Sequence, residues 1–180
     1  MIKKRTVIGA HAFFFPDQAA FTVPGAGTSS RTAKPGATDP AWIDCGVSDW
    51  DMQNTGKVSD FMAPSPGARQ LYDKVVVSKG LKLKGTLMEL SNLVWQVLLS
   101  AGTLPTSPTA GGAFNPLSGD PVVRGWLKLQ QYDQANTLIN TIDLFVAMVI
   151  PSDVKFAEKE VDVAVEADAL YSTLNTGTLA

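Results

Sequence analysis

The chain has 180 residues, a formal net charge of −2, 45% hydrophobic residues and 18% charged residues. This length is enough for one domain with its own core, and the near-neutral charge excludes a broad basic surface for nucleic acid. The charged fraction lies below the roughly 25% that is usual for soluble domains. We therefore expect either a large interior or an apolar surface that partners cover.

The N-terminal region is predicted to be a first strand over residues 3–15. Three basic residues followed by an apolar run imitate a secretion signal, but His11 interrupts the run and Pro16 ends it. No run of 18 or more apolar residues is present, so we expect no transmembrane helix.

Two stretches rich in Gly, Pro, Ser and Thr are predicted to be loops: residues 24–40, a flexible loop or arm, and residues 103–121, a loop excursion. A short strand is expected over 42–47. Residues 52–73 lack a sustained period and contain two prolines, so they are interpreted as a long loop. Loops of that length are uncommon inside a compact domain. Because this loop carries aromatic and methionine side chains, which usually pack against another surface, we expect a neighbouring molecule to cover it.

Residues 74–87 alternate in the manner of strands, and Gly80 is expected to mark a turn or bulge between two of them. The period then changes to that of a helix over residues 91–101. Ser91 is the expected N-cap and Gly102 the expected stop. This helix should pack its apolar side on a sheet.

The C-terminal part, residues 122–172, is predicted to be a β-meander. Residues 122–134 place Val, Gly and Leu on one face and polar or aromatic residues on the other, and residues 133–136 form a turn. Residues 138–150 are almost continuously apolar, which is typical of a strand buried on both faces. Residues 160–171 alternate apolar with mostly acidic residues, and residues 172–180 are interpreted as a tail.

The acidic face of that last strand carries Asp162, Glu166 and Asp168, with no basic partner on the same strand. It is open to three interpretations: a solvated strand face, a surface that lines a channel, or a catalytic site. At the spacing of alternate strand residues these carboxylates lie about 7 Å apart, and the sequence places no pocket-forming residues around them, which disfavours catalysis.

Other candidate chemistry is sparse. His11 is the one histidine and lies in an apolar run, where a structural role is expected, and Cys45 is the one cysteine, expected to be a small buried side chain. Asp49 and Asp51 could share a face and hold a cation, but the flanks supply few of the oxygens that calcium requires. No nucleotide-binding or zinc-protease motif is present. We therefore predict no enzyme activity, no metal site and no cofactor.

The order of parts in residues 40–180 resembles the major tail tube proteins of long-tailed bacteriophages. The resemblance rests on the predicted helix SNLVWQVLLSAG, the strand RGWLKLQQYDQ, and a final acidic strand that runs into ALYSTLNTGTL. It implies a mainly β fold, a sandwich or barrel flanked by one helix, related to the tube proteins of type VI secretion systems. It further implies hexameric rings, joined by sheet pairing between subunits and stacked into a hollow tube.

On this reading the protein is a virion component that is assembled in the host cytoplasm, and DNA passes through its lumen without specific binding. Expected partners are further copies and the tail terminator, tape measure and distal tail proteins. The predicted lumen-facing residues are Asp162, Glu166 and Asp168, with Lys128 and Gln130 as weaker candidates. The residues predicted to contact the adjacent subunit or ring are Phe61, Met62, Leu71 and Tyr72.

A general physical expectation points the same way, because long strands leave sheet edges that pairing with another copy would close. Two alternatives remain open. One is another phage structural component, such as a tail terminator, tube initiator or decoration protein, which would form a single ring or a trimer. The other is a ligand-binding or hydrolytic β-sandwich domain, which would be a monomer.

Overall fold

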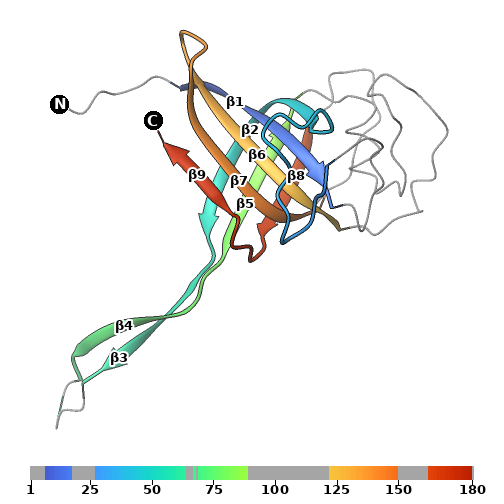
Figure 1. The fold of residues 1–180 in the computed structure, drawn as a ribbon. Coiled ribbons are helices and arrows are strands. Elements are labelled where there is room, and N and C mark those ends of the chain that lie inside the picture. Colours follow the sequence, from blue (N-terminus) through green and yellow to red (C-terminus); the bar gives the residue numbers. More distant parts are fainter. Residues whose placement is uncertain are drawn as a thin grey trace.

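In a computed structural model, most of the described residues lie in β-strands (Figure 1). The described residues are 7–17, 27–63, 67, 69–88, 122–149 and 162–179. The predicted helix over 91–101 and the loop over 103–121 lie outside them, as do residues 24–26 of the predicted arm. The strands are β1 (Val7–Pro16), β2 (Ile43–Asn54), β3 (Lys57–Met62), β4 (Leu71–Ser78), β5 (Leu81–Leu87), β6 (Val123–Asp133), β7 (Leu138–Val149), β8 (Val163–Ala169) and β9 (Thr176–Leu179).

Six of these strands form a closed antiparallel barrel. Their order is β6-β1-β2-β5-β8-β7, and pairing of β6 with β7 closes the sheet on itself. The ninth strand, β9, pairs with β7 beyond the end of β8. The prediction of a mainly β fold is thus confirmed in the form of a barrel, while the flanking helix is not part of the described structure.

Period-two alternation explains the barrel core. Along β8, Val163, Val165 and Ala167 point inward and are almost completely buried, whereas Ala164 and Asp168 are exposed. In β6 the predicted inward face is confirmed, since Val123, Leu127 and Leu129 all belong to the core. The turn over 133–136 is also confirmed: the Asn136 N–H donates to the Asp133 carbonyl, and Asn136 has a φ of 56°.

A second apolar cluster lies on the outside of the barrel. It consists of Phe15, Trp126 and Phe145, which are almost completely buried under residues 27–42 and the segment that follows β8. We call residues 27–42 the strap. The indole N–H of Trp126 donates to the carbonyls of Ser30 and Ala33, at 2.9 and 3.2 Å. The expectation of a loop holds for residues 27–40, which contain no helix or strand. A free arm is the wrong description, because this segment supplies acceptors for barrel side chains.

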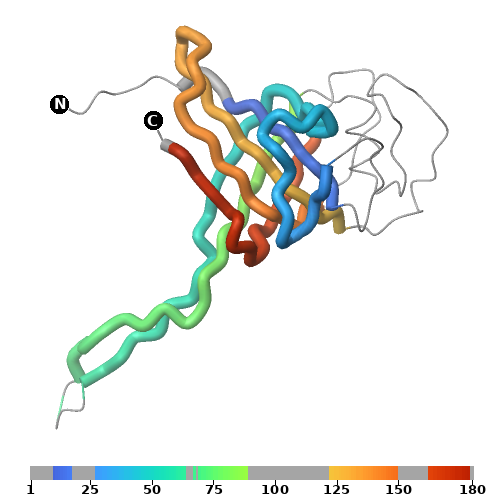
Figure 2. Tube along the Cα trace, in the orientation of Figure 1, coloured from blue at the N-terminus to red at the C-terminus, as the bar shows by residue number. Residues whose placement is uncertain are grey.

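The prediction of a long loop over residues 52–73 is also wrong. These residues include the end of β2, all of β3 and the start of β4, and β3 pairs with β4 as a two-stranded ribbon. The ribbon extends away from the barrel (Figures 1 and 2). It continues the β2–β5 hairpin past Gly80, whose carbonyl accepts the N–H of Thr55 at 2.9 Å. Gly80 does mark the break between two strands, as predicted.

The positions of the sheet edges differ from the expectation. The barrel wall is closed by β6 and β7 within one chain and does not depend on another copy. Among the described strands, outer edges remain on the ribbon and on β9, which pairs only with β7. Residues 172–180 were expected to be a tail, yet residues 176–179 form β9, because Thr176 and Thr178 continue the pairing along β7.

Gly125 in β6 allows β1 and β6 to approach closely. A Cβ at this position would lie 2.3 Å from the Phe15 carbonyl oxygen and 2.9 Å from the Pro16 Cα, so the backbone would have to move. We expect Gly125→Ala to lower the free energy of unfolding by about 1–3 kcal/mol, measured by urea denaturation. Gly36→Ala is the control, because nothing lies within 4 Å of its Cβ position; it should change stability by less than about 0.5 kcal/mol.

Candidate functional site: the ribbon and the charged wall

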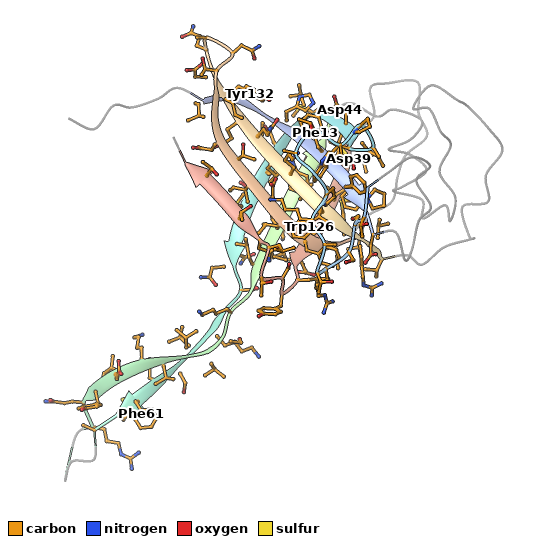
Figure 3. The ribbon with its side chains drawn as sticks, in the orientation of Figure 1. Phe13, Asp39, Asp44, Phe61, Trp126 and Tyr132 are labelled. Carbon is orange, nitrogen blue, oxygen red and sulfur yellow. The ribbon has the colours of Figure 1, made fainter. Side chains whose placement is uncertain are left out.

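The ribbon exposes apolar side chains along its whole length. Every residue of β3 and β4 is exposed, with Tyr72 at 78% and Phe61 at 61%. Phe61 lies near the far end of the ribbon (Figure 3). The structure thus brings together the four residues predicted to contact a neighbour, which lie on two paired strands at the ribbon's far end: Phe61, Met62, Leu71 and Tyr72.

Both faces of the ribbon are apolar. Directly opposed residues in an antiparallel pair share a face, so one face carries Val58 opposite Val76. The other carries Ser59 opposite Val75 and Phe61 opposite Asp73. Since an isolated two-stranded hairpin is at best marginally stable in water, a ribbon with two such faces is suited to lie between other surfaces.

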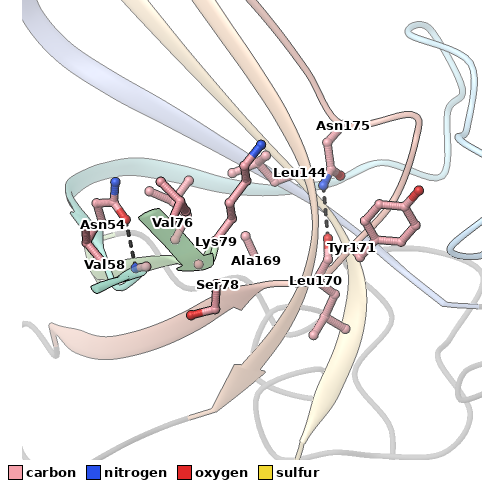
Figure 4. A pocket seen from close by; sticks show the side chains of 13 residues that line it. Asn54, Val58, Val76, Ser78, Lys79, Leu144, Ala169, Leu170, Tyr171 and Asn175 are labelled. Atoms are coloured by element: carbon pink, nitrogen blue, oxygen red, sulfur yellow. Dashed lines mark hydrogen bonds between the residues drawn. The ribbon is translucent and has the colours of Figure 1, made fainter. Parts of the chain in front are cut away.

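A notch of about 640 Å³ lies where the ribbon leaves the barrel (Figure 4). One side is the root of the ribbon, including Val58 and Val76, and the other is the segment after β8, including Leu170 and Tyr171. Leu144 and Ala169 contribute further apolar surface, and both pack against the barrel core. Tyr171 is 80% exposed at this site.

The predicted acidic face lies on the outside of the barrel and is part of a larger charged surface. Register places Asp51, Lys84 and Glu166 in one row across three adjacent strands, and Lys82 opposite Asp168 in the next row. We call this surface, on β2, β5 and β8, the charged wall. Its charged members in these strands are Asp49, Asp51, Lys82, Lys84, Glu166 and Asp168.

The two lysines of β5 alter the electrostatics that the sequence suggested. Lys82 Nζ lies 2.6 Å from Glu166 Oε2, and Lys84 Nζ lies 3.6 Å from Glu166 Oε1. The hydrogen bond from Lys82 lowers the pKa of Glu166 and raises the pKa of Lys82. Glu166 has no basic partner on its own strand but has two on the neighbouring strand. With four carboxylates against two ammonium groups, the charged wall remains negative.

The other predicted channel residues are divided between two places. Asp162 and Asp168 are exposed on the β8 side, as a surface role requires. Lys128 and Gln130 lie on β6, which β7 separates from β8. Lys128 is only 7% exposed, and its ammonium lies under the strap, so it does not offer its charge to a channel.

The strap holds Lys128 by contacts that the sequence did not reveal. Its Nζ donates to the Ala37 carbonyl at 3.1 Å and lies 3.9 Å from the centre of the Trp42 ring. Burial lowers the pKa of Lys128, although the nearby Asp143 carboxylate acts in the opposite direction. Lys34 of the strap pairs with Asp143 at 2.5 Å. A partly buried pair of charges thus joins the strap to β7.

The remaining candidates have structural positions. The ring of His11 lies on the barrel exterior and contacts the Asp44 carboxylate. Cys45 is buried as expected, and burial raises the pKa of its thiol to about 12. Asp49 and Asp51 belong to β2 and not to a turn. Among the described residues, no group of three or more His, Cys, Asp or Glu side chains is arranged to hold a metal ion.

Sequence reasoning missed Lys82, Lys84, Lys34 and Asp143 as functional partners. The lysines of β5 could have been found, because they alternate with core leucines and would flank the acidic strand once β5 and β8 were paired. No sequence signal links Lys34 to Asp143.

Comparison of the chain with models of known protein families and with curated proteins gives no match. In the described part of the chain, no helix has the length and hydrophobicity needed to cross a bilayer.

The ion pair of Glu166 predicts a pH-dependent contribution to stability. Because the pKa of Glu166 is lowered on folding, its contribution is complete above the ordinary glutamate pKa of about 4.3 and disappears as the pH falls through the folded value. We expect Glu166→Gln to lower the melting temperature slightly at pH 7, with the difference from wild type closing in strong acid. Asp49→Asn, opposite uncharged Thr86, should produce no such convergence in the same thermal scans.

Proposed function

We propose that the chain is a structural subunit that assembles with copies of itself, and specifically a tail tube subunit of a long-tailed bacteriophage. In this proposal six copies form a ring, and stacked rings form a hollow conduit through which DNA passes during ejection. The protein would act as part of the virion, with no catalytic step. Its partners would be other copies together with the tail terminator, tape measure and distal tail proteins.

The observation that carries the proposal is the fully exposed apolar ribbon. Large apolar side chains that stand together on the surface of a soluble protein indicate an interaction site, and the ribbon adds unpaired strand edges to them. The low charged fraction of the chain supports the same conclusion, since interfaces of obligate assemblies are extensive and apolar. The resemblance of the sequence to tail tube proteins supplies the specific assignment.

The charged wall is our candidate for the lumen surface. A channel lined by carboxylates repels the phosphates of DNA, whereas a basic channel would bind them with release of counterions. Asp162, Glu166 and Asp168 keep this role in the proposal, and Asp49 and Asp51 join them because register places them on the same surface. Glu166 contributes least free charge, since two lysines pair with it.

Electron microscopy of the purified protein, with and without a tail-tip nucleus, tests the assembly. Wild-type protein should form stacked rings with an open channel. We expect the double variant Phe61→Ser and Tyr72→Ser to remain monomeric with an unchanged circular dichroism spectrum, because both side chains lie on the ribbon, outside the barrel core.

The matched control is Val47→Ser, which removes an exposed apolar side chain from the barrel wall and should assemble as wild type does. Discrete rings or trimers without stacking would contradict the tube and favour a terminator, initiator or decoration protein. A wild-type protein that stays monomeric under all conditions would contradict self-assembly altogether.

The lumen assignment is tested by reversing charge on the charged wall. In tails assembled with Asp162→Lys and Asp168→Lys, added ammonium groups should bind passing phosphates and slow DNA ejection several-fold, most strongly at low salt. Gln134→Lys, at the β6–β7 turn, is the control and should leave the rate unchanged. Normal ejection from tails that carry both substitutions would show that this wall does not line the channel.

A further inference from the structure

We infer that the notch at the root of the ribbon is the receiving site for the ribbon of a second copy of this chain. The inference rests on the proposed self-assembly and adds to it the surface on which the ribbon docks. Three features of the notch match three features of the ribbon: apolar surface, an open strand edge, and one unpaired charge of opposite sign.

The apolar match comes first. The notch presents Leu144, Leu170 and Tyr171 beside the apolar base of its own ribbon. One face of the ribbon carries the exposed apolar side chains of Phe61 and Val75. A β-ribbon places alternate side chains on each face, so its side chains can enter a notch of this kind while its backbone stays at the rim.

An open strand edge lies next to the notch. Asn175 lines the notch and is followed directly by β9, which pairs with β7 and with no other described strand. The outer edge of β9 therefore offers backbone donors and acceptors to an added strand. Addition of a strand at such an edge combines backbone hydrogen bonds with pockets for alternate side chains. The ribbon, with its own outer edges, is suited to this mode of binding.

Charge supplies a third, independent match. On the ribbon, Asp60 pairs with Lys74 at 3.3 Å, while Asp73 forms no ion pair within the described part of the chain. Lys79 lines the notch (Figure 4). Its ammonium likewise forms no ion pair with a carboxylate of the described residues. Asp73 lies opposite Phe61, on the same face of the ribbon, so docking of this face brings a carboxylate to a notch that holds one cation.

The geometry requires the ribbon to come from another molecule. The root of each ribbon forms one side of its own notch, through Asn54, Gly56 and Ser78, and the far end extends away from it (Figure 1). Each copy therefore gives a ribbon to one neighbour and receives one from another, which is a heterologous contact that closes into rings or extends as filaments. The 14 strand residues of one ribbon fall short of the roughly 20–30 residues per side of a standard interface. Each copy takes part in two such contacts, one as the donor of a ribbon and one as the receiver.

Charge reversal tests the pairing of Asp73 with Lys79. Asp73→Lys and Lys79→Asp should each raise the protein concentration needed for half-maximal assembly about three- to tenfold. The double variant should return to within about twofold of wild type. Lys57→Asp, at the start of β3 and outside the notch lining, is the control and should not be rescued by Asp73→Lys. Additive losses in the double variant would overturn the inference.

Cysteine cross-linking tests the location directly. The native Cys45 is buried with a raised pKa, so it will not compete with introduced thiols. A mixture of Phe61→Cys protein and Tyr171→Cys protein should form disulfide-linked dimers under mild oxidation, at a yield at least about fivefold above either protein alone. Phe61→Cys mixed with Ala135→Cys, at the far turn between β6 and β7, should stay at background.

The outcomes separate the two proposals. Assembly with the Phe61–Tyr171 link supports both. Assembly without that link, or with equal linking to the Ala135 position, overturns the notch as receiving site while the assembly stands. Failure of the wild-type protein to assemble at any concentration overturns both.

Discussion

Closure of six antiparallel strands forces every second side chain into the barrel, and this constraint determines where the rest of the molecule can carry out its function. The interior is filled by apolar residues from all six strands. A polar exception, Ser48, is fully buried and accepts a hydrogen bond from the Trp50 indole at 2.9 Å, in accord with the rule that buried polar groups find partners. Since apolar residues fill most of the inward positions in the described barrel, the charged and exposed apolar side chains lie on its outer wall and on the ribbon.

The same alternation explains why the strap exists. Phe15, Trp126 and Phe145 occupy outward positions and would expose three aromatic rings on adjacent strands without a cover. The strap covers them and also supplies carbonyl acceptors for the Trp126 indole. Lys34 and Asp143 add a charge pair at the strap's contact with β7. A second, smaller core is thus built outside the first, from a stretch whose composition is that of a loop.

The parts of the fold that sequence predicts are those where one face is buried. The alternation of apolar and polar residues identified β6 and β8, and the continuous apolar run identified β7. In each strand, the burial of a position determines the type of residue that it carries. The strand β3 and the start of β4 escaped this reasoning, whereas residues 74–78 of β4 were predicted to be strand. Both faces of the ribbon are exposed, so residues such as Val58 and Phe61 show no alternation of buried and exposed positions. The prolines between its two strands suggested a loop instead. Pairing with β7 makes β9 a strand despite its Thr-Gly-Thr sequence.

The residues of the candidate sites were likewise predictable from the sequence only in part. The acidic residues of β8 were identifiable from spacing alone, but the pairing of Glu166 with Lys82 and Lys84 depends on which strand lies next to β8. The aromatic and methionine residues of the ribbon were predicted from their chemistry to contact a neighbour, but their arrangement on two paired strands was not predicted. Contacts of Lys128 with Ala37 and Trp42 join residues distant in sequence through a backbone carbonyl and a ring face, and neither leaves a pattern.

The ribbon has a consequence for how this protein can be studied and stored. The ribbon has no interior of its own, so its curvature depends on the surface that it contacts. Its exposed apolar side chains favour association between molecules when the protein is concentrated. We therefore expect association through the ribbon, and not unfolding of the barrel, to limit the storage of the purified protein.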